Sequence, residues 1–379
     1  MGKQCATSNR WKLIDSADKH RFQMVSAFLC TLLINSTVLA ASLGMVADNA
    51  NDVVNLFDVE SGAIVASING EMGRISGDCA LSRDQVTGFS SHANQRIAVY
   101  QISEYSTDEG VGVSSIEISN AGVDMSLSPN GRLLVSAGAG NSYEPLSVVD
   151  TQSKLEVATA GLFLDHTSAE FCDDGTLLVT TTYGNSFAMP FDNAIYDASV
   201  SPDGAMELLG NRLSSGAQPN NASCAPGSKA GVLLDRESGL TSFTLPGLEK
   251  ADFASLQGAI AVSAVFNHGG DRLYVRTSEA VHAFNFNPIN GLIEPDWVQT
   301  VSFSSEYFGI DQIALDPDRG RLYVDGGDVL LVLDPATGLQ SGSIHAGDAT
   351  GICFAQRQPL DRVPEMVKIE LHDNDSSGT

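Results

Sequence analysis

The segment Val123-Asp-Met-Ser-Leu-Ser-Pro-Asn-Gly131 returns almost unchanged as Tyr196-Asp-Ala-Ser-Val-Ser-Pro-Asp-Gly204. In both copies an alternating run of apolar and polar residues leads into a turn rich in Pro, Asn or Asp, and Gly. This pattern is typical of a β-strand that ends in a tight turn. Another apolar run follows each turn, at residues 132–136 and 205–209. The two copies therefore predict β-hairpins as a repeated unit.

Weaker copies of the hairpin occur along the chain, and we call the residue aligned with the Ser of Ser-Pro the register position. These positions are Ser82, Ser128, Cys172, Ser201, Asn267 and Asp316, at intervals of 46, 44, 29, 66 and 49 residues. Most intervals fit one blade of a β-propeller, which spans roughly 40 to 45 residues. The shortest interval predicts a trimmed fourth blade. The longest predicts a surface insertion at residues 213–230 in the fifth blade.

A second recurring element is an apolar run that ends in Asp. It occurs at residues 53–58, 146–150, 231–235 and 329–334, and a turn and another run follow it. These segments read as third and fourth strands of the same unit. The order strand, turn, strand, loop, strand, turn, strand predicts a four-stranded antiparallel blade.

The two ends of the repeat region complement each other. Residues 42–46 form a second strand with no first strand before it, and residues 351–355 form a first strand with nothing after it. Pairing the C-terminal strand into the N-terminal blade removes both exposed sheet edges. The sequence therefore predicts an all-β, seven-bladed β-propeller over residues 41–356, with a flexible tail at 357–379.

Several short motifs carry a resemblance to known proteins: the pairs Tyr274-Val275 and Tyr323-Val324, the turn at residues 334–338, and the turn at 201–204. On these residues the chain resembles seven-bladed propellers with YVTN-type repeats and the related lactonase-like propellers, over residues 42–356. That resemblance implies the fold. It implies either a binding or surface protein or a lactone hydrolase, and no catalytic motif of the family transfers to a residue of this chain.

The N-terminal region is typical of a secretory signal peptide. Residues 22–47 carry no charged side chain and follow Lys19, His20 and Arg21, and small residues near Ala40 suit cleavage. We expect residues 1–40 to be removed and the protein to be secreted or periplasmic. The alternative is an uncleaved membrane anchor, although polar residues interrupt the apolar run.

Charge limits the partners. The chain has 21 Lys and Arg against 46 Asp and Glu, a net charge of −25. This charge repels nucleic acid and anionic membrane surfaces. The expected partner is a small molecule or a protein at the channel mouth, bound by a monomer.

A polar column lies four residues before the register positions. It contains Asp78, Asp124, Ser168, Asp197, Ser263 and Gln312, with Gly351 from the closing strand. If Asp78, Asp124 and Asp197 converge, they could bind calcium or act as acid and base. The favoured alternative is that each carboxylate accepts hydrogen bonds from nearby amides.

The loops that lead into the same strands add further candidates for a ligand site at the channel mouth. They contribute Arg74, Asp165, His166, Tyr196, Tyr307 and His345. Either histidine could act as a general base or a metal ligand, because imidazole titrates near neutral pH. The alternative for both is an ordinary solvated side chain.

Four cysteines, Cys79, Cys172, Cys224 and Cys353, follow the predicted signal peptide. An even number suits disulfides in an oxidising compartment. Cys79 and Cys353 fall on the innermost strands of adjacent blades and could form a disulfide across the ring closure, or remain two buried thiols. Cys172 at a turn and Cys224 in the insertion are expected on opposite rims, with no bond between them.

The sequence favours an exported propeller that binds a ligand or protein, with no catalysis assigned. The alternative is a lactonase-type hydrolase that uses the acidic, calcium-binding channel mouth. An electron-transfer or quinoprotein role is disfavoured, because the chain has neither a haem-attachment motif nor a pair of vicinal cysteines.

Overall fold

The computed structural model describes residues 42–69, 75–82, 84–106, 110–120, 122–138, 145–160, 165–182, 193–214, 219–235, 239–301 and 312–355. All its strands belong to the unit Leu43–Thr379. The predicted signal peptide and tail lie outside the described residues. Within them, no helix is long and apolar enough to cross a membrane.

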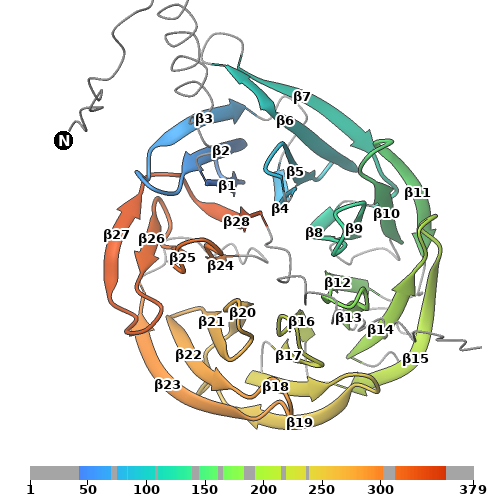
Figure 1. Cartoon of the computed structure of the whole chain (residues 1–379), viewed down its shortest axis with the longest axis vertical. Helices are drawn as coiled ribbons and strands as arrows, with labels where there is room; N and C mark the ends of the chain where they lie inside the picture. The colour runs from blue at the N-terminus through green and yellow to red at the C-terminus, as the bar shows by residue number, and fades with distance from the viewer. Residues whose placement is uncertain are drawn as a thin grey trace, which may run out of the picture. The chain divides into compact units, whose positions relative to one another are not determined.

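Seven four-stranded antiparallel sheets form a ring, which confirms the predicted fold (Figure 1). With the innermost strand first, blade one contains β28 (Ala349–Phe354), β1 (Leu43–Asp48), β2 (Val53–Asp58) and β3 (Ile64–Asn69). Blade two contains β4 (Ile75–Leu81), β5 (Thr87–His92), β6 (Arg96–Ser106) and β7 (Gly110–Glu117). Blade three contains β8 (Gly122–Leu127), β9 (Leu133–Gly138), β10 (Leu146–Asp150) and β11 (Leu155–Ala160).

The remaining four blades follow the same order around the ring. Blade four contains β12 (Asp165–Phe171), β13 (Leu177–Thr182), β14 (Ala194–Val200) and β15 (Met206–Ser214). Blade five contains β16 (Pro219–Cys224), β17 (Ala230–Asp235), β18 (Gly239–Thr244) and β19 (Glu249–Ala254). Blade six contains β20 (Ala261–Phe266), β21 (Arg272–Thr277), β22 (Ala280–Phe286) and β23 (Ile293–Thr300). Blade seven contains β24 (Ile313–Leu315), β25 (Leu322–Asp325), β26 (Leu330–Leu333) and β27 (Gln340–Ile344).

The hydrophobic core is divided into layers between neighbouring blades. The two middle strands of a blade are covered on both faces, so β9 and β10 are buried throughout, whereas the outer strand β11 alternates between exposed and half-buried residues. Three rings, Phe57, Tyr323 and Phe354, form such a layer between blades seven and one, with centroids 5.1 to 5.9 Å apart. Each blade therefore depends on its neighbours for burial of its apolar side chains.

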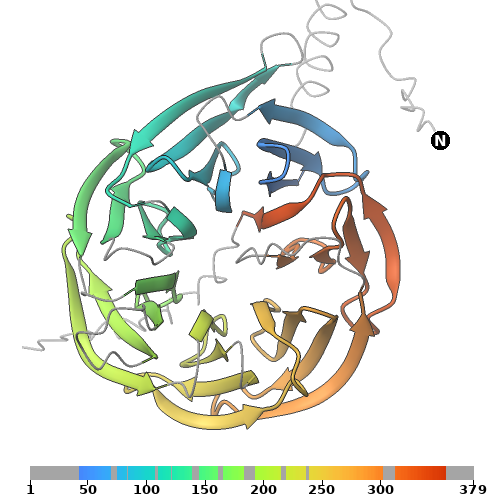
Figure 2. The same cartoon turned by 180° about the vertical axis from the view of Figure 1, so that it is seen from behind.

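The ring closes where the sequence predicted. Strand β28 pairs antiparallel with β1, with Met45 opposite Cys353 and Gly44 opposite Phe354 (Figure 2). Gly351 fits against blade two because it has no side chain: a Cβ there would lie 2.9 Å from the Cα of Asp78. The C-terminal strand thus contacts both the blade that it completes and the next one.

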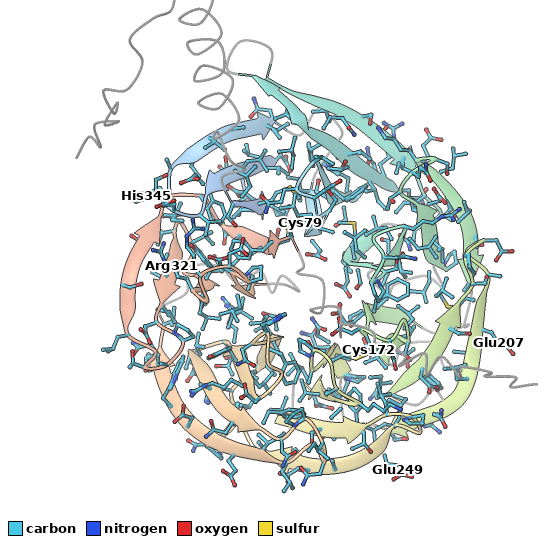
Figure 3. The ribbon with its side chains drawn as sticks, in the orientation of Figure 1. Cys79, Cys172, Glu207, Glu249, Arg321 and His345 are labelled. Atoms are coloured by element: carbon cyan, nitrogen blue, oxygen red, sulfur yellow. A yellow bond between two sulfur atoms is a disulfide. The ribbon has the colours of Figure 1, made fainter. Side chains whose placement is uncertain are left out.

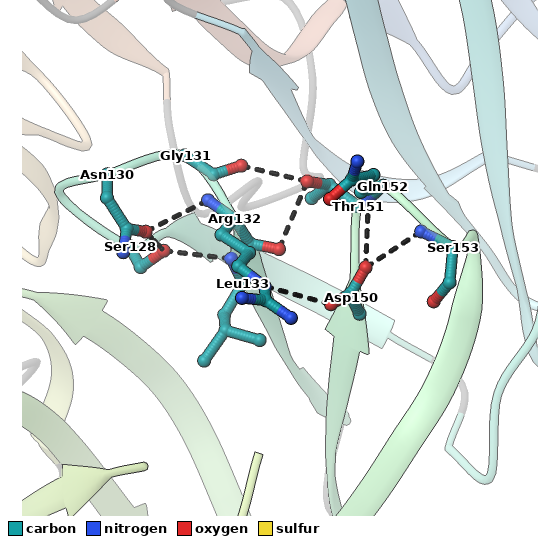
Figure 4. Close-up of polar contacts among 9 residues, drawn as sticks. All are labelled: Ser128, Asn130, Gly131, Arg132, Leu133, Asp150, Thr151, Gln152 and Ser153. Carbon is teal, nitrogen blue, oxygen red and sulfur yellow. Dashed lines mark hydrogen bonds and ion pairs between the residues drawn. The ribbon is translucent and has the colours of Figure 1, made fainter. Parts of the chain in front are cut away.

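The repeated hairpin is held by its own polar side chains, as blade three shows (Figure 4). Ser128 Oγ accepts a hydrogen bond from the amide of Leu133 (2.9 Å), and Asn130 Oδ1 accepts one from the amide of Arg132 (3.0 Å). At the end of the third strand, Asp150 Oδ1 accepts from the amide of Ser153 (2.7 Å). That backbone bond is the main cause of the lowered pKa of Asp150. The recurring Asp therefore closes the turn to the fourth strand.

The predicted strand order in blades four and five was wrong. Strand β14 is the third strand of blade four, so the turn at residues 201–205 leads to the fourth strand β15. Residues 219–224, predicted as part of a surface insertion, form β16, the innermost strand of blade five. Residues 231–235 belong to the second strand, β17, and not to a third. The register position of blade five is therefore Ala225, and the intervals from 172 to 225 and from 225 to 267 become 53 and 42 residues.

The error has a local cause. The carbonyl of Ser201 accepts a hydrogen bond from the amide of Gly204, and the amide of Ser201 donates one to the carbonyl of Ala205, both at 2.8 Å. In the same way, the carbonyl of Ser128 accepts one from the amide of Gly131 at 2.7 Å. The same turn chemistry thus serves two positions in a blade. Only the pairing with neighbouring strands distinguishes them.

Candidate functional site

Backbone irregularities set the direction of the polar column. In blades one and three to six the innermost strand shifts register immediately before the column residue, as between Gly122 and Asp124 or between Ala261 and Ser263. In blade two the shift lies between Ile75 and Cys79 and includes the column residue Asp78. A β-bulge at such a point redirects the next side chain. The column is therefore built by a repeated bulge.

The structure changes one member of the predicted column. Asp197 lies on β14, where its carboxylate accepts hydrogen bonds from the amide (3.1 Å) and side chain (2.6 Å) of Asn211. Asn221 occupies the column position in blade five, and Ser168 Oγ donates to its Oδ1 at 3.5 Å. The overlooked signal was the Ala225-Pro226 turn, which repeats the Pro that follows Ser128.

The two other carboxylates of the column bridge adjacent blades. Asp78 Oδ2 accepts a hydrogen bond from the amide of Met125 in blade three at 2.9 Å. Asp124 Oδ2 accepts one from the amide of Ala169 in blade four at 2.7 Å. Both carboxylates are buried. Their bonds join the innermost strands of blades two, three and four.

The predicted cluster of three carboxylates is not formed, because Asp197 stands on the third strand of its blade while Asp78 and Asp124 stand on innermost strands. Across the part of the chain that the structure describes, no group of three or more His, Cys, Asp or Glu side chains could hold a metal ion. Asp78, Asp124 and Asp197 therefore do not converge on one ring of innermost strands.

Among the remaining predicted site residues, His345 and Gln312 lie at opposite edges of blade seven. His345 is exposed and follows the outermost strand β27, at the rim of the ring rather than its channel (Figure 3). Gln312 is buried and donates its Nε2 to the carbonyl of Ala349 at 3.3 Å. Arg74 and Tyr307 lie outside the described residues, as does the side chain of His166.

Two disulfides join innermost strands of neighbouring blades. Cys79 on β4 bonds Cys353 on β28, with Cα atoms 5.9 Å apart, so a covalent bond spans the ring closure. Cys172 bonds Cys224, with Cα atoms 5.4 Å apart, and this corrects the expectation that they lie on opposite rims. Because β16 is an innermost strand, Cys224 ends that strand beside the equivalent end of β12.

A cavity of about 490 Å³ lies at the centre of the ring, lined by residues from all seven innermost strands. It extends from Asp124 and Asn221 of the column to the hairpin turns at Pro129, Asp173 and His268. The sequence had predicted a mouth at the loops that lead into these strands. The cavity instead occupies the part of the channel beyond the column. Its volume falls within the range of small-molecule sites.

The lining of this channel cavity has two unlike sides. Blades three, four and five contribute most of its polar side chains, namely Asp124, Ser126, Glu170, Asp173, Asn221 and Ser223, interspersed with apolar residues such as Met125 and Leu127. Blades six, seven and one contribute mainly apolar ones, including Val265, Ile313, Ile352 and Phe354. Strands β8, β12 and β16 lie opposite β20, β24 and β28 in the ring (Figure 1). None of the described residues that line the cavity is Lys or Arg.

A buried ion pair joins blades six and seven beside the column. Arg276 Nη2 lies 3.3 Å from Asp325 Oδ2, and these side chains are 3% and 1% exposed. Burial raises the pKa of Asp325 to about 6 and lowers that of Arg276 to about 10. Asp325 Oδ1 also accepts from the amide of Gly327 at 3.0 Å. Burying these two charged groups therefore costs desolvation free energy, which their mutual attraction offsets in part.

This pair predicts a pH-dependent contribution to stability. The pKa of Asp325 is raised from 3.8 in the unfolded chain to about 6 in the folded protein, so the folded state binds this proton more tightly. The stability gained from that proton is complete below pH 3.8 and is lost as the pH rises through 6. The positive charge of Arg276 lowers the pKa of Asp325, and the negative charge of Asp348 raises it, but burial has the larger effect. The free energy of unfolding of the wild type, minus that of Asp325→Asn, should fall on the order of 2 kcal/mol between pH 4 and 7. Urea denaturation at several pH values measures this difference, and parallel profiles for the two proteins would contradict it.

Comparison with known proteins supports the fold. No protein-family model matches the chain, and neither does any curated protein. Among solved structures, a functionally unknown protein from Desulfotomaculum acetoxidans is similar, with a TM-score of 0.71 and 17% identity over 83% of this chain and 100% of that one. The periplasmic gluconolactonase of Pseudomonas aeruginosa has a TM-score of 0.65 and 16% identity over 83% and 99% of the chains. A putative 6-phosphogluconolactonase from Bacteroides fragilis has a TM-score of 0.63 and 14% identity, over 84% of this chain and 99% of that one. At these identities the similarity shows the propeller fold alone.

Proposed function

We propose that this chain is an exported β-propeller that binds a small organic molecule in the channel cavity. The observation that carries the proposal is a cavity of about 490 Å³ lined by all seven innermost strands, with most of its polar side chains on one side and a mainly apolar lining on the other. Small-molecule sites combine an apolar lining with a few convergent polar groups in this way. A concave site of this volume favours a small molecule over a protein partner.

Export is supported by the disulfides. All four cysteines in the described part of the chain are paired, and disulfides persist in oxidising compartments outside the cytosol. The predicted signal peptide agrees with this location. A structural neighbour from Pseudomonas aeruginosa is itself described as periplasmic.

A lactonase-type hydrolase is the second candidate function. Two similar structures are described as a periplasmic gluconolactonase and a putative 6-phosphogluconolactonase. In this chain Glu170, Asp173 and His268 line the cavity and could transfer protons to or from a bound lactone. Asp173 Oδ2 accepts from the amide of Gly227 at 2.7 Å, which assigns it a structural role as well.

A fragment screen tests the binding function. Ligand-observed NMR with a library of neutral and charged fragments should find compounds whose signals change with the wild-type protein. Ser223→Trp should abolish these effects, because Ser223 is a partly exposed residue of the cavity lining. Ser115→Trp is the matched control, since Ser115 is exposed on the outer strand β7. Binding that survives Ser223→Trp, or a screen without hits, would contradict the proposal.

A lactone panel separates binding from catalysis. Acid release from gluconolactone, 6-phosphogluconolactone and aliphatic lactones, with and without calcium, should equal the uncatalysed rate. Turnover that Glu170→Gln abolishes and Glu207→Gln leaves intact would favour the hydrolase, because Glu207 lies on the outer rim (Figure 3).

A further inference from the structure

We infer that the channel cavity takes an amphipathic molecule without negative charge, oriented with its polar head towards blades three to five and its apolar body against blades six, seven and one. This rests on the proposed function, because it names the class of ligand that the same cavity would bind. The inference also predicts that phosphorylated sugars bind poorly.

The polar side offers hydrogen-bond partners. Glu170 and Ser223 are partly exposed, whereas Ser126 and Asn221, which also line the cavity, are buried. Ser126 and Asn221 already bond to protein groups: Ser126 Oγ accepts from the amide of Phe171 at 3.0 Å. These bonds hold the polar side in place before a ligand arrives, which lowers the entropic cost of binding.

The opposite side offers apolar surface. Val265 and Phe354 are partly exposed in the cavity lining, while Ile313 and Ile352 are each 3% exposed. Bringing a hydrocarbon chain against these side chains removes apolar area from water on both partners. A ligand with a polar head alone would leave this surface without a partner.

Charge decides which polar head is accepted. The described cavity lining includes three carboxylates, Asp124, Glu170 and Asp173, one histidine, His268, and no Lys or Arg. A phosphate needs cationic or backbone amide donors, and carboxylates in a low-dielectric channel repel it. A sugar hydroxyl or another neutral donor can instead bond to carboxylate and amide oxygens.

A homologous series of alkyl glucosides tests the apolar body. Calorimetric titration with methyl, butyl and hexyl β-glucoside should show affinity rising roughly three- to fourfold for each added methylene. Val265→Ser should flatten this rise, because it removes apolar surface from the cavity wall. Val113→Ser is the matched control, since Val113 is 44% exposed on β7 and lies away from the channel. An affinity independent of chain length, or no binding of hexyl glucoside, would overturn the inference.

Hexyl phosphate tests the charge rule with the same apolar body. It should bind at least about tenfold more weakly than hexyl glucoside, and Glu170→Gln should narrow that gap while Glu207→Gln leaves it unchanged. Equal binding of the two compounds would overturn the exclusion of anions. If fragments bind in a Ser223→Trp-sensitive manner but alkyl glucosides do not, the proposed function stands and this inference fails. If nothing binds, both fail.

Discussion

A chain that ends at Asp348 should lose cooperative unfolding and aggregate. The truncation removes β28, which pairs with β1 and packs on blade two through Gly351. It also removes Cys353 and with it the disulfide to Cys79. Blade one then keeps three strands, and the edge of β1 is left without a partner.

The measurement is a urea titration monitored by far-UV circular dichroism and by tryptophan fluorescence. Trp297 reports on the contact between blades six and seven, because its Nε1 donates a hydrogen bond to the carbonyl of Pro335 at 3.2 Å. The wild type should unfold in one transition, and the truncated chain in none. A second truncation that removes only residues 360–379 is the control, and it should unfold like the wild type. If both truncations abolish the cooperative transition, β28 is not the strand that closes the ring.

Replacing Arg276 by Met should destabilise the protein by about 3 to 5 kcal/mol. The substitution leaves the carboxylate of Asp325, which is 1% exposed, without its nearby positive charge. Asp325 also joins β25 to the start of β28 through an amide hydrogen bond from Ala349. The loss should therefore weaken the junction of blades six, seven and one.

The double variant Arg276→Met/Asp325→Leu shows whether the loss of stability comes from the lost attraction or from the buried carboxylate that is left without a partner. Because both charged groups are then replaced by apolar ones of similar size, most of the lost stability should return. The control pair is Arg96 with Glu117, an exposed pair 3.4 Å apart on blade two. Arg96→Met should change stability by less than about 1 kcal/mol. If Arg276→Met costs no more than Arg96→Met, the buried pair has no structural importance.

The lactonase-like structural neighbours should not be taken as evidence of the substrate. Their identity to this chain is 14 to 16%, which supports the fold and nothing finer. The propeller fold leaves the lining of its channel free to vary, because blade stability comes from layers between the sheets. The ligand class has to be argued from the lining of this chain, which is acidic on one side and apolar on the other.

The sequence by itself determined the fold. Alternating apolar strands, tight turns and Asp-terminated third strands are local signals, and each is satisfied by hydrogen bonds within a few residues, as at Ser128 and Asp150. The closure also followed from the sequence, because the unmatched strands at the two ends could remove both exposed edges only by pairing with each other.

Only the tertiary structure decided which hairpin is innermost in blades four and five. The turns that start at Ser128 and Ser201 share the Ser-Pro pair and a hydrogen bond from the Gly amide to the Ser carbonyl, so the sequence could not rank them. The choice depends on contacts between strands far apart in the chain, and it places Asn221 in the column and Cys224 beside Cys172.

The candidate site depends on tertiary structure for the same reason. Asp78 and Asp124 were identified from their spacing, but their partners are amides of the next blade, at positions 125 and 169. The polarity of the cavity likewise arises from seven strands that contribute a few side chains each. Periodicity along the chain reports where a residue stands within its blade, whereas its chemical environment is set by blades about 45 residues away in the sequence.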